Sequence, residues 1–155
     1  MPERKFGRML ARVIRKRSRA LLRGASGSFK RGRDAELHAL RIDVKRLRYT
    51  LELAVPLARD EAIVTLELLA LLQERLGDLA DANTFARTYG NLARTLPTND
   101  PRRAGLETLR TQATRAGARA LEAARALWRG ADAPYPERLA ASISATLGSL
   151  SNGVA

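Results

Sequence analysis

The chain has 155 residues, of which 45% are hydrophobic and 28% charged, a composition typical of one soluble globular domain with its own core. It contains no cysteine and one histidine, which excludes disulfide bonds and thiolate metal sites. No run of about 18 apolar residues is present, and the N-terminal segment lacks the apolar stretch of a signal peptide. We therefore expect a cytoplasmic protein without a membrane span.

The positive charge is concentrated in the first third of the chain. Residues 1–50 hold 16 Lys+Arg and 4 Asp+Glu, a net +12, whereas residues 51–155 hold 12 of each and are neutral. Of the 28 basic residues, 24 are arginine, whose planar guanidinium donates two hydrogen bonds at once to phosphate oxygens. A charge gathered in this way attracts anions, so the sequence predicts a phosphate-rich partner.

Helical periodicity runs through almost the whole chain, and no segment reads as a strand. The first expected helix covers residues 3–23. One side of its helical wheel is apolar, with Phe6, Leu10, Val13, Ile14 and Leu21. The opposite side is basic, with Arg4, Arg8, Arg12, Arg15 and Arg19. The Gly/Ser-rich stretch 24–33 predicts a turn that carries further positive charge.

The second expected helix covers residues 34–54, with Asp34 as its N-cap. Its core stripe, at spacings of three and four, is Leu37, Leu40, Val44, Leu47 and Leu51. A third helix starts near residue 60, and Gly77 is expected to bend or interrupt it before the pattern resumes over 78–96.

After a break at 97–101, a fourth helix is expected over 102–129, followed by a Gly/Pro linker and a short amphipathic tail helix over 137–150. Long helices joined by short loops favour an all-α fold, an antiparallel four-helix bundle with a short C-terminal tail helix. We expect residues 1–130 to form the bundle, with its basic face in 1–50, and residues 131–155 to form the linker and tail.

The second helix carries the most informative pattern. His38, Arg41, Lys45 and Arg48 are spaced by three, four and three, so they share a face about 80° wide beside the leucine stripe. Cations on that face rise roughly 5 Å per turn, which suits an extended phosphate chain along the helix axis. Arg46 points elsewhere, and Tyr49 lies towards the flank.

This helix resembles the signature of the CHAD family, the conserved histidine α-helical domain. The matching residues are His38, Arg41, Ile42, Lys45, Arg46, Leu47, Arg48 and Tyr49. A second family motif is matched by Leu72, Gln73, Leu76, Gly77 and Asp81. The resemblance covers roughly residues 10–130. CHAD members have two tandem four-helix halves, and this chain resembles a single half of the C-terminal type on account of Tyr49 and Glu52.

The resemblance implies binding of inorganic polyphosphate through basic helix faces, with polyphosphate granules as a location. The expected polyphosphate-binding residues are His38, Arg41, Lys45, Arg46, Arg48, Tyr49, Arg8, Arg12, Arg15 and Arg19. The implied protein partner is a second copy in a homodimer or another CHAD-like half. Spare apolar surface for such a contact is expected on the fourth helix and on the tail, at Leu139, Ile143, Leu147 and Leu150.

Several alternatives accompany this interpretation. His38 is either a ligand contact or a hydrogen-bonded structural histidine, and Asp78 and Asp81 are either a metal pair or, more simply, caps or ion-pair partners of the second helix's arginines. A general nucleic-acid-binding basic helical protein shares the same charge, and a basic amphipathic first helix also suits a membrane surface. No phosphate loop, nucleophile elbow or metal-ligand cluster is apparent, so we expect no enzyme activity, no cofactor and no metal.

Overall fold

The computed structural model describes residues 2–152. Over this range the chain is all α-helical, as predicted, with no strand. Its five helices are α1 (Pro2–Arg31), α2 (Asp34–Glu52), α3 (Arg59–Thr95), α4 (Pro101–Arg129) and α5 (Tyr135–Asn152). Among these helices, none combines the length and the apolar character needed to cross a membrane.

The chain divides into two compact units. The first comprises residues 1–73 and 125–155, and the second comprises residues 74–124. The first unit therefore holds α1, α2, α5, the beginning of α3 and the end of α4. The second unit holds the remainder of α3 and α4, and each unit is described by itself.

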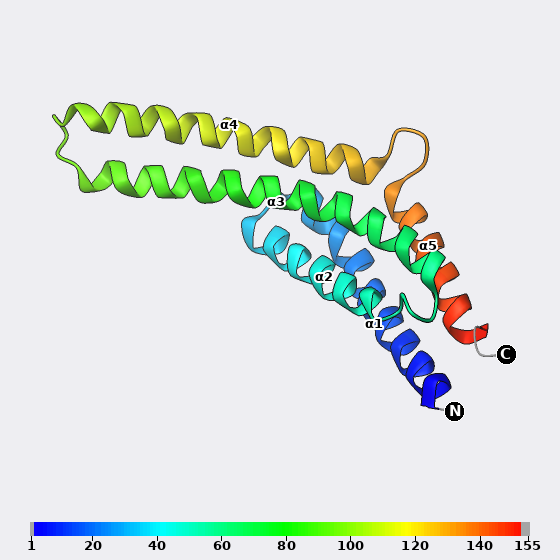
Figure 1. Cartoon of the computed structure of the whole chain (residues 1–155). Coiled ribbons are helices and arrows are strands. Elements are labelled where there is room, and N and C mark those ends of the chain that lie inside the picture. The colour runs from blue at the N-terminus through cyan, green and yellow to red at the C-terminus, as the bar shows by residue number, and fades with distance from the viewer. Residues whose placement is uncertain (1, 153–155) are drawn as a thin grey trace. The chain divides into compact units, whose positions relative to one another are not determined.

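In the first unit, α1 and α2 lie side by side and α5 packs against α1 (Figure 1). The apolar stripe of α1 is buried through Leu10, Ile14 and Leu21, and each such side chain contributes about 1.5–3 kcal/mol on leaving water. Phe6, predicted on the same side, is 40% exposed. The adjacent Gly7 is instead the buried position, where an added Cβ would lie 3.3 Å from the Leu150 carbonyl oxygen. The apolar side of α1 is thus committed to the core and is not free for a membrane surface.

The predicted turn over residues 24–33 is wrong, because α1 continues to Arg31. Ala25 and Phe29 continue the buried stripe and are 0% and 4% exposed, so their burial outweighs the low helix propensity of the neighbouring glycines. The helix ends at Gly32, whose φ of 61° is the left-handed conformation that favours glycine after a helix. The Arg125 Nε donates a 2.7 Å hydrogen bond to the Phe29 carbonyl near this end.

The expected N-cap of the second helix is also corrected. Arg33, not Asp34, occupies the N-cap position, with φ −76° and ψ 134° and no side-chain capping bond. Asp34 is the first helical residue, where the positive end of the helix dipole stabilises its negative carboxylate. The core stripe is as predicted: Leu37, Leu40, Val44, Leu47 and Leu51 are all buried.

Gly77 does not interrupt the third helix, which is continuous over 37 residues. A Cβ at Gly77 would meet nothing within 4 Å, so no close packing requires the glycine. Its cost to the helix is about 1 kcal/mol. The buried Leu76 and Leu79 on either side outweigh that cost and keep the helix intact.

The expected tail helix belongs to the core of the first unit. Leu139, Ile143 and Leu150 are at most 4% exposed, so three of the four tail residues predicted to offer spare apolar surface are buried, while Leu147 is half-buried. Hydroxyl groups also join α5 to α3, since Thr65 Oγ1 lies 2.6 Å from Ser142 Oγ and 3.1 Å from Thr146 Oγ1.

An aromatic cluster joins the ends of α1 and α4 to the start of α5. Trp128 lies between Phe29 and Tyr135, with ring centroids 5.2 Å and 5.6 Å away, and it is buried in the core. The Tyr135 hydroxyl donates a 2.6 Å hydrogen bond to the Leu68 carbonyl. Burial raises the pKa of Tyr135 well above its ordinary value.

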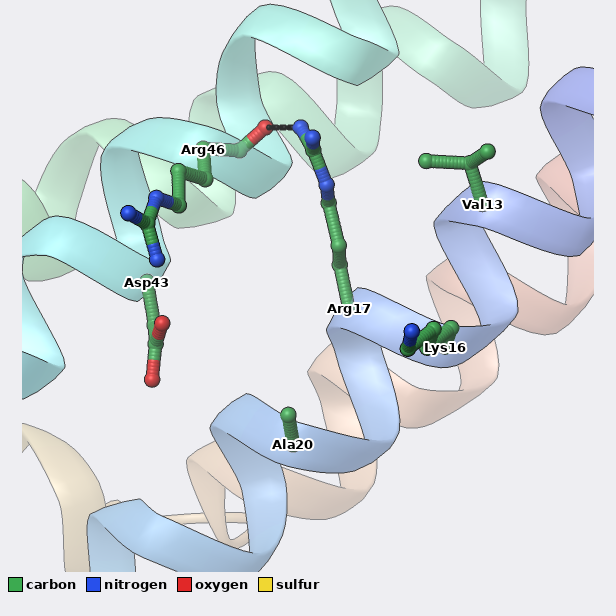
Figure 2. A pocket seen from close by; sticks show the side chains of 6 residues that line it. All are labelled: Val13, Lys16, Arg17, Ala20, Asp43 and Arg46. Carbon is green, nitrogen blue, oxygen red and sulfur yellow. Dashed lines mark hydrogen bonds between the residues drawn. The ribbon is translucent and has the colours of Figure 1, made fainter.

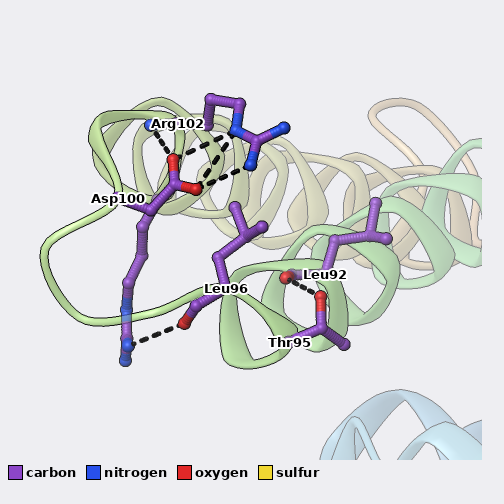
Figure 3. Close-up of polar contacts among 6 residues, drawn as sticks. Leu92, Thr95, Leu96, Asp100 and Arg102 are labelled. Atoms are coloured by element: carbon purple, nitrogen blue, oxygen red, sulfur yellow. Dashed lines mark hydrogen bonds and ion pairs between the residues drawn. The ribbon is translucent and has the colours of Figure 1, made fainter.

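In the second unit, α3 and α4 form an antiparallel hairpin (Figure 1). The helices approach closely at two glycines: a Cβ at Gly117 would lie 2.9 Å from the Asn83 Oδ1, and one at Gly90 would lie 3.0 Å from the Arg110 Cδ. Figure 3 shows the connecting turn, where Asp100 accepts a 2.9 Å hydrogen bond from the backbone N–H of Arg102. The Arg102 guanidinium lowers the pKa of Asp100 to about 2.

Candidate polyanion interface

The exposed face of α1 carries a continuous set of cations. Five of them line a hollow of about 410 Å³: Arg12, Arg15, Lys16, Arg19 and Arg23. Arg8 lies one turn earlier on the same side of the helix. We call these six residues the α1 surface. All six are exposed.

No carboxylate neutralises the α1 surface. Within the described part of the chain, its six residues form no ion pair and no side-chain hydrogen bond. The reason lies in the sequence, because α1 contains Glu3 as its single acidic residue and no Asp or Glu stands three or four positions from Arg8, Arg12 or Arg15. These guanidinium groups are therefore available to an anion.

A groove of about 540 Å³ runs between α1 and α2 (Figure 2). Its lining consists of Val13, Lys16, Arg17, Ala20, Asp43 and Arg46. Lys16 lines both the groove and the hollow. On its α2 side the groove presents the cation of Arg46 together with the carboxylate of Asp43.

Arg17 joins the two helices and was not among the predicted site residues. Its Nη1 donates a 2.7 Å hydrogen bond to the Arg46 carbonyl and a second bond to the Thr50 hydroxyl. The only signal in the sequence is its position on the edge of the apolar stripe, away from the other α1 cations. Arg17 thus fixes α1 against α2 and is not free for a ligand.

The second set of cations lies on the other flank of α2. We call His38, Arg41, Lys45 and Arg48 the α2 surface. Arg48 is held in place: its Nη1 donates a 3.1 Å hydrogen bond to the Gln73 Oε1 on α3, and its Nε lies 3.6 Å from the Glu52 Oε1.

Arg41 has a different environment. The residue is half-buried, and its Nε atom is buried without a hydrogen-bond partner among the described residues. A buried donor without a partner costs about 1–3 kcal/mol. Arg41 therefore carries a donor that nothing in the described chain satisfies.

The remaining predicted residues are more open to solvent. Lys45 is half-buried, and Tyr49 is 60% exposed. His38 is exposed and makes no hydrogen bond within the described residues, which favours the interpretation as a ligand contact over that as a hydrogen-bonded structural histidine.

The structure does not bring all the predicted residues to one face. Arg46 lies about 100–160° around the helix axis from Arg41, Lys45 and Arg48, as the sequence predicted. Its groove lies on the side that faces α1, whereas Arg48 contacts α3. The predicted site is therefore two basic surfaces.

Of the two carboxylates considered for metal binding or for pairing with arginines of α2, Asp78 instead pairs within its own helix. Asp78 lies 4.0 Å from the Arg75 Nη1, an ion pair one helical turn apart. Within residues 2–152, no group of three or more His, Cys, Asp or Glu side chains is placed to hold a metal ion.

The sequence comparison identifies the family. The model of the CHAD domain matches residues 2–90, more than half of the chain, and the chain belongs to the CHAD family. The match contains both α1 and α2, and therefore both basic surfaces. A search of curated proteins and a search of solved structures gave no match.

Proposed function

We propose that this CHAD protein binds inorganic polyphosphate through the arginine-rich faces of α1 and α2. The observation that carries the proposal is the α1 surface, where exposed arginines line a hollow and have no carboxylate partner. Because every polyphosphate unit bears negative charge, a chain laid along this face meets a cation at each turn of the helix. Membership of the CHAD family supports the same ligand.

The exposed aromatic residues argue against general nucleic-acid binding, the alternative function. Base stacking on aromatic side chains supplies much of the affinity of single-strand binders. In residues 2–50, only Phe6 and Tyr49 among the aromatic side chains are exposed, while Phe29 is buried in the core. The surfaces therefore suit a polymer that offers phosphate without bases.

We further propose that the protein binds polyphosphate without catalysing any reaction on it. We also propose that it works in the cytoplasm at polyphosphate granules, and that it pairs with a second copy or with another CHAD-like half. Phosphoryl transfer requires positioned metal ions or an activated nucleophile. Orthophosphate release from polyphosphate that follows the purified protein, with magnesium or manganese present, would contradict the first point. Light scattering with and without polyphosphate tests the pairing.

A competition experiment tests the ligand. Labelled long-chain polyphosphate is bound to the protein, and unlabelled polyphosphate, duplex DNA or single-stranded RNA is added at equal phosphate concentration and equal salt. We expect polyphosphate to displace the label and both nucleic acids to fail. All three affinities fall with salt because counterions are released, so the order of displacement is the decisive result. Displacement by DNA as effective as that by polyphosphate overturns the proposal.

A further inference from the structure

On the basis of the proposed function, we propose that a single chain binds two polyphosphate segments at once, one on the α1 surface and one on the α2 surface, and so bridges separate polyphosphate chains. The activity inferred is cross-linking of the polymer, in addition to binding. It depends on the two surfaces being separate sites, which the contacts around α2 define.

The α1 surface faces away from the flank of α2 that carries the other cations. Arg17 reaches from α1 to the backbone of α2 at Arg46, which fixes α1 on the Arg46 side. Arg48 reaches from the other flank to Gln73 of α3. With α1 against one side of α2 and α3 against the other, the α2 surface lies on the flank of α2 that faces away from α1.

An uncharged strip separates the two surfaces on the solvent side of α2. Ile42, Tyr49 and Leu53 occupy the positions between Arg46 and the α2 surface. Tyr49 and Leu53 are 60% and 57% exposed, so the strip is open to solvent and offers no cation to a polyanion crossing it. Beneath it lies the buried leucine stripe of α2. A polyphosphate segment bound to one surface therefore makes no additional ion pair by crossing the strip towards the other surface.

Each surface is large enough to hold a segment. The α1 surface extends about 22 Å along its helix from Arg8 to Arg23, and the α2 surface extends about 15 Å from His38 to Arg48. Charges are screened over about 10 Å at ordinary salt. Two anionic segments on the two surfaces are thus weakly coupled, and both sites fill.

The sites also differ in character. The arginines of the α1 surface are exposed and unpaired, whereas Arg41 and Arg48 are half-buried and Arg48 is already held by Gln73. Ordering a long exposed side chain costs conformational entropy, so the α2 surface is the better prepared of the two. We expect two sites of unequal affinity.

Calorimetric titration with tripolyphosphate counts the sites, because three phosphates are too few to reach around α2. The wild-type chain is expected to bind two equivalents. R12E/R15E/R19E and R41Q/K45Q/R48Q are each expected to bind one, with circular dichroism confirming helix content. The second variant replaces the cations with glutamine, not glutamate, because a carboxylate at the partly buried Arg41 would destabilise the fold. The wild-type stoichiometry alone decides the question if a variant fails to fold, and a single equivalent with tight binding overturns the inference.

A bridging assay tests the consequence. Donor-labelled and acceptor-labelled long polyphosphate are mixed, and protein is added. Energy transfer is expected to rise, then fall when protein is in excess and each surface finds its own chain. At protein concentrations where light scattering shows a monomer, both single-surface variants should bind polyphosphate and give no energy transfer. Bridging by either variant at the wild-type level contradicts the inference, whereas absence of all binding by the wild type contradicts the proposed function itself.

Discussion

Helices α1 and α4 are both rich in arginine, yet they present their charge in opposite ways. On α1, Arg8, Arg12 and Arg15 have no partner among the described residues. On α4, the Arg110 Nε lies 3.1 Å from the Glu107 Oε2, and Arg102 lies 2.7 Å from the Asp100 Oδ2. The number of arginines alone therefore does not distinguish the two helices. On α1 the exposed cations are also gathered on one face, and no carboxylate stands within one helical turn of Arg8, Arg12 or Arg15.

The largest expected effect comes from reversing charge on α1. R12E/R15E/R19E should weaken binding of long-chain polyphosphate at the α1 surface by more than tenfold and reduce the slope of log affinity against log salt at that surface by roughly 3, because each phosphate contact adds about one to that slope. The three residues are exposed and lie opposite the buried stripe, so the helical circular-dichroism signal should persist. Fluorescence anisotropy over a salt series measures both quantities.

The matched control is R87E/R115E/R119E. These three arginines are also exposed, and they lie in the neutral part of the chain. The control carries the same change in net charge, so we expect less than a threefold loss of affinity. Equal losses in the two triple variants would show that only total charge matters.

A smaller change tests the effect of a nearby carboxylate without removing any cation. Ala20 is exposed and lines the groove, four positions after Lys16 and three before Arg23. A20E should pair with these cations and lower polyphosphate affinity by roughly threefold. The reciprocal variant E107A, which releases Arg110 on α4, should leave affinity almost unchanged. A gain of affinity in E107A as large as the loss in A20E would contradict the special role of α1.

Gln73 offers a test of positioning on the α2 surface. Q73L removes the acceptor that holds the Arg48 guanidinium and should lower affinity for tripolyphosphate at the α2 surface by about two- to threefold, through the entropy of ordering the released side chain. Binding at the α1 surface should be unaffected. The control Q73E keeps an acceptor for the Arg48 guanidinium. The Arg48 Nε–H resonance should therefore stay ordered in Q73E and lose order in Q73L. An unchanged Arg48 resonance in Q73L would contradict the positioning role.

The smallest effect on binding is expected from Y135F, which alters the core alone. Loss of the hydrogen bond from the Tyr135 hydroxyl to the Leu68 carbonyl should lower the free energy of unfolding by about 1 kcal/mol, measured by urea denaturation. Polyphosphate affinity should equal that of the wild type. A marked loss of affinity would mean that the α5 packing and the basic surfaces are coupled.

The helices could be predicted from the sequence because their core residues repeat with helical spacing, as Ile14 and Leu21 do on α1. The break expected at residues 24–33 failed since burial of Ala25 and Phe29 depends on neighbouring helices that local propensity does not record. For the same reason the sequence did not predict the role of α5. Its apolar side was interpreted as spare surface, whereas it packs against α1.

The candidate site could likewise be predicted from the sequence only in part. The helical wheel correctly separated the α1 arginines from the core and placed Arg46 away from Arg41, Lys45 and Arg48. It gave no sign that Arg17 binds the α2 backbone or that Gln73 holds Arg48, because these contacts join residues 29 and 25 positions apart. Which side of α2 faces α1 and which faces α3 depends on such contacts, and they turn one predicted site into two surfaces.

The most direct measurement follows the arginine Nε–H resonances of the protein by NMR while polyphosphate is added. Guanidinium groups that bind phosphate should shift and broaden in proportion to occupancy. The account predicts this for Arg8, Arg12, Arg15 and Arg19, with little change for Arg102 and Arg110, which already bind carboxylates. Equal shifts at the paired arginines of α4, or none along α1, would contradict the claim that the unpaired cations of α1 form the binding surface.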